Sequence, residues 1–153
     1  MRLLIISLAA FVSYHPCRAN IGDTIEQAKQ KLGEPDHRYP VSGSNQFILR
    51  WIKDGLGTDI YFGDDGVAYE EQYIKASSAS HLSVDDARHI LASESDLTNW
   101  TEYHLAERVA WRSKTDGRAA VYGADSHVLI IVKRGEWVEA IMGGNWPRSG
   151  DHP

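Results

Sequence analysis

The feature that most constrains the fold of this chain is a pattern that occurs twice, about sixty residues apart. Each copy begins with a hydroxyl residue, has an acid or amide three positions later, and continues with apolar residues on one helical face. The two copies are residues 24–32 and 83–91. This is the pattern of a short amphipathic helix that starts with a capping box. The sequence therefore predicts two similar short helices.

Each predicted helix is followed by three stretches of strand-forming residues. These stretches are residues 47–53, 58–62 and 67–75, and then 108–113, 118–122 and 127–133. Asp-Gly pairs separate several of them, and this dipeptide is a strong hairpin signal. Aromatic positions also recur, since Trp51 and Trp111 are 60 residues apart. We interpret the chain as a tandem repeat; the alternative is a chance similarity, because helix caps and Asp-Gly turns are common.

One short helix and three strands bury too little apolar surface to be stable alone. We therefore expect an α+β fold in which two repeats, each a helix plus a three-stranded antiparallel β-meander, form one continuous sheet with the helices on one face. The expected segments are residues 20–75 for the first repeat, 76–82 for a linker of small residues, 83–135 for the second repeat, and 136–153 for a C-terminal extension ending in a frayed tail.

Residues 1–19 have the composition of a secretory signal peptide. Arg2 precedes a run of mostly apolar residues that is too short to span a membrane, and Pro16 ends that run. We expect cleavage after Ala19 and a secreted or periplasmic product; the alternative is an N-terminal helix or strand of the domain. Cleavage would remove Cys17, which is the only cysteine, so the product could form no internal disulfide.

The charge balance argues against one class of partner. The chain has 16 Lys and Arg against 21 Asp and Glu, a net charge of −5, and loss of Arg2 and Arg18 would give 14 − 21 = −7. An acidic surface repels phosphate backbones, so we expect no nucleic-acid partner. No apolar run in the rest of the sequence reaches spanning length either, so we also expect no integral membrane span. The sequence does not indicate an oligomeric state.

Residues 21–35 carry a resemblance to a known family. They combine a Gly-Asp-Thr helix opening at 22–24 with a Leu-Gly-Glu-Pro exit at 32–35. This run resembles the opening of small exported BamE/SmpA-OmlA-like domains, in which a helical segment precedes an antiparallel three-stranded sheet. The tandem version resembles the β-lactamase inhibitor protein fold, and residues 111–117 resemble a pattern of uncharacterised exported bacterial proteins. The resemblance implies an exported α+β protein and assigns no functional residue.

No complete catalytic or metal-binding motif is present in the sequence. His89 follows Asp85 by four positions and Asp86 by three, which suits either a metal site or an exposed Asp–His pair. Another histidine, such as His127, could act as a base beside an acid. No nucleophile elbow, Cys–His pair or glycine-rich phosphate loop occurs. We therefore expect no metal and no cofactor, and a non-catalytic protein; the alternatives are a small exported hydrolase and a purely structural domain.

Aromatic residues on the predicted strands give the clearest functional signal. Strand alternation places Tyr69 and Tyr73 on one face together with Glu71, and a face that mixes tyrosine and glutamate is typical of a half-exposed surface. Tyr61 could join this face, and Trp51 lies on the first predicted strand. We predict that Trp51, Tyr61, Tyr69 and Tyr73 form an aromatic sheet face that binds a protein, or a glycan, in the cell envelope. The alternative is that they complete a two-sided core.

Overall fold

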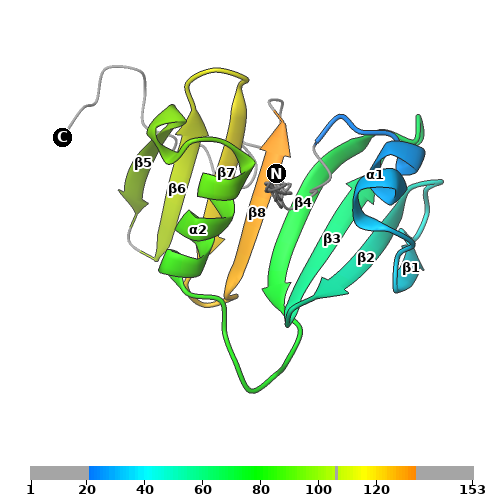
Figure 1. Cartoon of the computed structure of the whole chain (residues 1–153), viewed down its shortest axis with the longest axis horizontal. Helices are drawn as coiled ribbons and strands as arrows, with labels where there is room; N and C mark the ends of the chain where they lie inside the picture. The colour runs from blue at the N-terminus through cyan, green and yellow to red at the C-terminus, as the bar shows by residue number, and fades with distance from the viewer. Residues whose placement is uncertain (1–20, 106, 134–153) are drawn as a thin grey trace, which may run out of the picture.

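The computed structural model describes residues 21–105 and 107–133. The elements in chain order are α1 (Ile25–Leu32), β1 (His37–Pro40), β2 (Phe47–Lys53), β3 (Leu56–Phe62), β4 (Ala68–Lys75), α2 (Val84–Glu94), the 3₁₀ turn η1 (Leu97–Asn99), β5 (Trp100–Leu105), β6 (Arg108–Ser113), β7 (Arg118–Gly123) and β8 (Val128–Lys133). All eight strands belong to one antiparallel sheet with the order β1-β2-β3-β4-β8-β7-β6-β5 (Figure 1). The strands β4 and β8 therefore join the two halves of the chain at the centre of the sheet.

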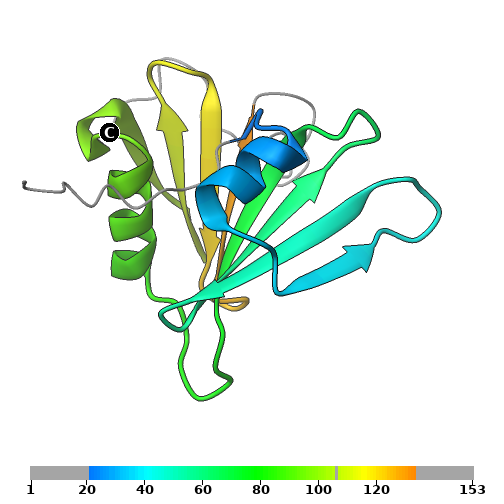
Figure 2. The ribbon, with the colours of Figure 1, turned by 45° about the vertical axis from the view of Figure 1, so that its right-hand side comes forward.

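Both helices lie on the same face of the sheet, α1 over β2–β4 and α2 over β6–β8 (Figures 1 and 2). The first helix packs Ala28 against Leu49, Ile60 and other apolar residues of the first half. The second helix packs Leu91 against a larger cluster that includes Trp111, Tyr122, Leu129 and Ile131. The two larger apolar clusters of the described residues are therefore on the helix side of the sheet. A smaller third cluster around Ala110 and Val121 lies on the opposite side, because these two residues alternate with helix-side residues along β6 and β7.

The prediction of two helix plus three-stranded repeats is wrong, because each half of the chain contributes four strands. The two strands that the sequence did not indicate are β1 and β5, which form the two edges of the sheet. All four residues of β1 are exposed, and Pro40 ends it, so it has no alternating apolar pattern. In β5 the helix-side positions Trp100, Glu102 and His104 mix apolar with polar residues. A duplication of the chain stays a prediction.

Local signals in the sequence are confirmed at the helix starts and at the hairpin that joins β2 to β3. Thr24 and Ser83 each form a complete capping box with the residue three positions later. Lys53 pairs with Leu56, so Asp54 and Gly55 form a two-residue hairpin loop. Both loop residues have positive φ, 52° and 77°, as the favoured type I′ turn requires.

Three sequence predictions concern parts of the chain outside the described residues. These are the signal peptide at 1–19, the end of the second repeat and the C-terminal extension at 136–153. Within residues 21–105 and 107–133, no helix combines the length and apolar character needed to cross a membrane.

Candidate functional site

The face of the sheet opposite α1 and α2 carries a row of aromatic and polar side chains in the first half of the chain. Tyr39 on β1 pairs with Ile48 on β2, Ile48 with Tyr61 on β3, and Tyr61 with Glu70 on β4. Directly paired residues of antiparallel strands point to the same face, so these four form one row. No described helix packs on this side, and we call this part of β1–β4 the open face (Figure 2).

A second row of the open face runs beside the first and contains an ion pair. His37, Arg50, Asp59 and Gln72 are paired in turn across β1–β4. Arg50 donates two hydrogen bonds to the carboxylate of Asp59, which is 6% exposed. These bonds raise the pKa of Arg50, so this side chain stays a charged guanidinium. The Arg50 guanidinium also lies 5.4 Å from the ring centroid of Tyr39.

The structure does not bring the four predicted aromatic residues together. Trp51 and Tyr73 are 5% and 2% exposed and belong to the two core clusters on the helix side. Tyr61 and Tyr69 are half-buried and their ring centroids lie 6.2 Å apart. The expectation that Tyr69 and Tyr73 share a face is wrong, because β4 has a bulge: Tyr61 pairs with Glu70 but Phe62 pairs with Ala68. The extra residue, Tyr69, interrupts the alternation.

Glu70 is the acid of the first row, and it is buried. It is 6% exposed, and its Oε1 accepts a hydrogen bond of 2.6 Å from the amide of Gln72. Burial raises the pKa of Glu70, and the Gln72 bond opposes this only in part. Burial, followed by the nearby charge of Glu70, raises the pKa of Tyr61 to about 12, and the same two causes raise the pKa of Tyr69. These three groups therefore form one electrostatic cluster.

Tyr39, Asp59 and Glu70 are members of this face that the sequence pattern did not indicate, although the position of Asp59 had a readable signal. A two-residue loop at Asp54 and Gly55 fixes the register of β2 against β3, which places Arg50 opposite Asp59. The position of Tyr39 depends on β1, which the sequence pattern did not indicate. The position of Glu70 depends on the bulge, which forms only when β4 pairs with β3.

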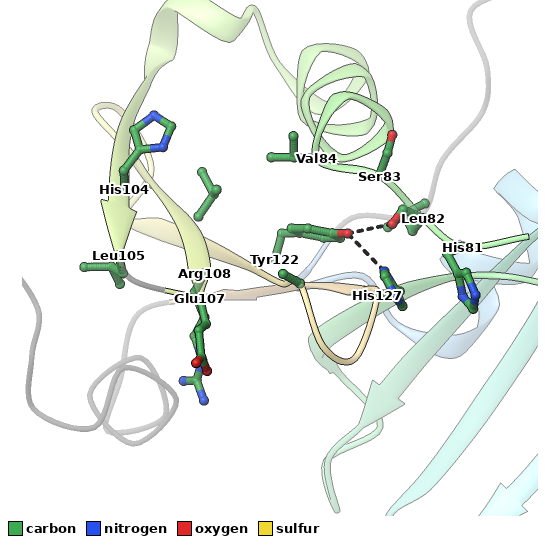
Figure 3. Close-up of a pocket in the computed structure, with 12 residues that line it drawn as sticks. His81, Leu82, Ser83, Val84, His104, Leu105, Glu107, Arg108, Tyr122 and His127 are labelled. Carbon is green, nitrogen blue, oxygen red and sulfur yellow. Dashed lines mark hydrogen bonds between the residues drawn. The ribbon is translucent and has the colours of Figure 1, made fainter.

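A separate pocket of about 550 Å³ lies beside the start of α2 and includes His127 (Figure 3). The Tyr122 hydroxyl donates to the carbonyl of Leu82 at 2.6 Å and lies 3.3 Å from His127 Nδ1. The imidazole of His127 stacks on that of His81, with centroids 4.3 Å apart. Glu107 also lines the pocket but points away from His127. Among the described residues, His127 is therefore oriented by a tyrosine hydroxyl and not by a carboxylate.

The three residues of α2 whose spacing suits a metal site, Asp85, Asp86 and His89, make contacts within the helix and its cap. Asp85 accepts from Arg88, Asp86 caps the helix through Ser83, and His89 Nδ1 lies 2.7 Å from the backbone carbonyl of Asp85. No cluster of three metal-ligating side chains occurs in the part of the chain that the structure describes.

A second cavity lies on the helix side, between the end of α1 and α2. It has a volume of about 820 Å³, and its lining includes Trp51, Leu56, Tyr73 and Ile90. Trp51 is held there because its indole nitrogen donates to the carbonyl of Gly33 at 3.0 Å. Trp51 and Tyr73 therefore line a groove between the helices and contribute nothing to the open face.

Comparison with known proteins gives no family. No family model matches the sequence, and no curated protein matches it significantly. A cysteine-rich secretory protein from Staphylococcus aureus subsp. aureus Mu50 is similar in structure at 9% identity, with a TM-score of 0.43 over 80% of this chain and 47% of that chain. An extracellular protein containing an SCP domain from Bacillus anthracis str. Ames gives 9% identity and a TM-score of 0.43, over 99% and 56%.

The chain spans about half the length of these two solved structures. A structural similarity at this level supports no inference about function, because proteins with a similar fold can have unrelated functions. The resemblance to BamE/SmpA-OmlA-like repeats stays a prediction.

Proposed function

We propose that this protein is a non-catalytic binding module that recognises a protein partner through the open face of β1–β4. The observation that carries the proposal is the composition of that face. Tyr39 and Ile52 are 39% and 45% exposed, and Ile48, Arg50 and Tyr61 are half-buried beside them. Tyrosine and arginine in an apolar setting are the residues that dominate binding energy at protein interfaces.

The aliphatic residues of the open face favour a protein over a glycan. Ile48 is paired with Tyr61, and Ile52 and Ile74 are both paired with Gly57 of β3. Such branched side chains contribute by apolar burial, at roughly 25 cal/mol per Å². A sugar-binding site needs, besides aromatic rings, hydrogen-bonding groups that are available to the sugar hydroxyls. The groups best suited to that role, Arg50 and Asp59, already bond to each other.

Site-specific photo-crosslinking in the cells that make the protein tests the proposal. A benzoylphenylalanine residue replaces Ile52 on the open face or, as a matched control, the exposed Gln30 on α1. We expect a distinct crosslinked protein from position 52 and not from position 30. The paired substitution Tyr39→Ala and Tyr61→Ala should reduce that product at least fivefold. The same product from both positions, or no loss in the paired variant, would contradict the proposal.

We also propose that the module is exported and acts in the cell envelope or outside the cell. The proposal is supported by residues 1–19, in which a cation precedes an apolar run and small residues precede the expected cleavage site, as in a secretory signal peptide. The expected product begins at Asn20, and intact-mass measurement of protein recovered from the periplasm or medium checks this. Recovery of the uncleaved chain from the cytosol alone would refute it.

A further inference from the structure

We propose that the open face contains a subsite for a cationic side chain of the partner, an arginine, at the cluster of Tyr61, Tyr69 and Glu70. This inference rests on the proposed function, because it names the chemistry that the partner presents to the open face. Three observations support it: the hydrogen bonding of Glu70, the placement of the two rings around it, and the contrast with the neighbouring acid Asp59.

Glu70 is a buried carboxylate whose hydrogen bonding is incomplete. It is 6% exposed, and its one hydrogen bond among the described residues comes from the neutral amide of Gln72. A carboxylate has about four acceptor positions, and a buried charge without a partner is costly. Burial accordingly raises the pKa of this group. A guanidinium that binds both carboxylate oxygens would supply the missing donors and the opposite charge.

The second acid of the open face shows what the subsite lacks. Asp59 is buried to the same degree as Glu70, but it has two hydrogen bonds from Arg50. Asp59 pairs with Gln72 and Tyr61 pairs with Glu70, so the two acids occupy adjacent rows of one face. The face therefore contains a completed guanidinium–carboxylate pair beside a carboxylate of similar burial with no described cation.

The two tyrosines provide a site for a flat cation. Tyr61 is directly opposite Glu70, and the ring of Tyr69 is tilted by 60° against that of Tyr61 at 6.2 Å. Aromatic ring faces attract cations, and arginine is preferred because its planar group stacks on the ring. The open face already contains one such contact, between Arg50 and Tyr39. The acidic balance of the chain, a net charge of −5, also favours approach of a basic partner.

The groups that face Glu70 come from its own strand β4 and from the two neighbouring strands, β3 and β8. On β3 these are Tyr61 and, in the next row, Asp59; on β4 they are Tyr69 and Gln72. On β8 the residue paired with Glu70 is Val132, which carries no charge. A basic side chain in this position is therefore missing from the described strands on either side of β4.

The experiment uses Nα-acetyl-L-arginine amide as the probe and the full-length protein labelled with ¹⁵N. Titration should give saturable NMR shifts at the backbone amides of Tyr61, Tyr69, Glu70 and Gln72. The citrulline analogue has the same shape without the charge, and we expect it to bind at least fivefold more weakly. Equal shifts from both compounds, or shifts spread over all surface acids, would overturn the subsite.

Two matched variants connect the binding to Glu70. The substitution Glu70→Gln should weaken arginine amide binding at least fivefold, while Glu107→Gln, which neutralises an exposed acid of the second half, should not change it. An unchanged amide spectrum outside the cluster confirms that Glu70→Gln is folded. If that variant does not fold, Tyr61→Leu provides the same test through loss of one ring. Binding that survives the folded variant refutes the proposal.

The two proposals fail separately. If arginine amide does not bind but crosslinking from position 52 depends on Tyr39 and Tyr61, the subsite is refuted and the binding face stands. If arginine amide binds through Glu70 but crosslinking does not distinguish position 52 from position 30, the partner-binding role is refuted and the cation subsite stands.

Discussion

Glu102 on β5 is the hydrogen-bonding centre that attaches α2 to the edge of the sheet, and its replacement should destabilise the fold. Its carboxylate accepts two hydrogen bonds from Arg88 of α2, at 2.7 and 3.0 Å, and one from the indole of Trp111, at 2.8 Å. It also lies 2.9 Å from His104 Nε2. The Trp111 side chain is almost completely buried, so Glu102 satisfies a donor that water does not reach.

The expected loss follows from these contacts. A hydrogen bond to a charged group contributes about 1.5–3 kcal/mol, and the 27% exposure of the Glu102 side chain reduces the value of its ion pair. In Glu102→Gln the side-chain carbonyl oxygen can still accept a hydrogen bond. The new NH₂ group is itself a donor, so it faces an N–H donor of Arg88 or Trp111 without an acceptor between them. We expect a loss of about 2–3 kcal/mol in the free energy of unfolding.

The loss should depend on pH in one direction. The bonds from Arg88 hold the pKa of Glu102 below its ordinary value of about 4.5. A depressed pKa in the folded state means that the stabilisation is complete above the unfolded value and disappears as the pH falls through the folded value. The difference between wild type and Glu102→Gln should therefore be largest near pH 7 and shrink below pH 4.5.

Urea unfolding followed by tryptophan fluorescence measures this effect. Glu107→Gln is the matched control, since it makes the same chemical change at an exposed position, and it should stay within about 0.5 kcal/mol of wild type. A double-mutant cycle with Arg88→Met should show coupling of about 1 kcal/mol or more. A loss below about 0.5 kcal/mol for Glu102→Gln, or a loss that grows as the pH falls, would refute the reasoning.

Two further substitutions test contacts at the start of α2. Tyr122→Phe removes the donor to the Leu82 carbonyl, a bond of 2.6 Å in the core, and should lower the free energy of unfolding in urea by about 1–3 kcal/mol. The control Tyr39→Phe changes an exposed ring and should lower it little. Equal losses in the two variants would contradict a stabilising role for the Tyr122 hydrogen bond. Ser83→Ala removes the capping hydroxyl that accepts from the Asp86 amide at 3.1 Å and should lower the free energy of unfolding by about 1 kcal/mol. Hydrogen exchange of the backbone amides in the first turn of α2 should accelerate. Unchanged exchange there would argue against a stabilising role for the cap.

Features that depend on neighbouring residues could be read from the sequence, and features that depend on distant pairing could not. The helix starts at Thr24 and Ser83 follow from hydroxyl and carboxyl or amide groups three residues apart. The hairpin at Asp54 and Gly55 follows from the positive φ that these residues tolerate. By contrast, β1 has no buried face to impose alternation, so only its partner β2 identifies it as a strand.

The aromatic residues of the candidate site show the same division. Trp51 and Arg50 are adjacent in β2 and lie on opposite faces of it, as simple alternation requires. Alternation fails for Tyr69 because it assumes an unbroken period of two, and the bulge adds a residue to β4. Nothing within β4 shows where its register shifts, since the shift arises from pairing with Tyr61 and Phe62 on another strand.

The central pairing of β4 with β8 has a consequence for the order in which the chain acquires its structure. Glu71 on β4 pairs with Ile131 on β8, so β4 stays an open sheet edge until the last described strand has been synthesised. An open edge of strand-forming residues is a template for aggregation, and charged side chains are the usual protection. β4 carries Glu70, Glu71 and Lys75. The acids that are buried at the centre of the finished sheet can therefore protect the nascent chain during the interval before its second half arrives.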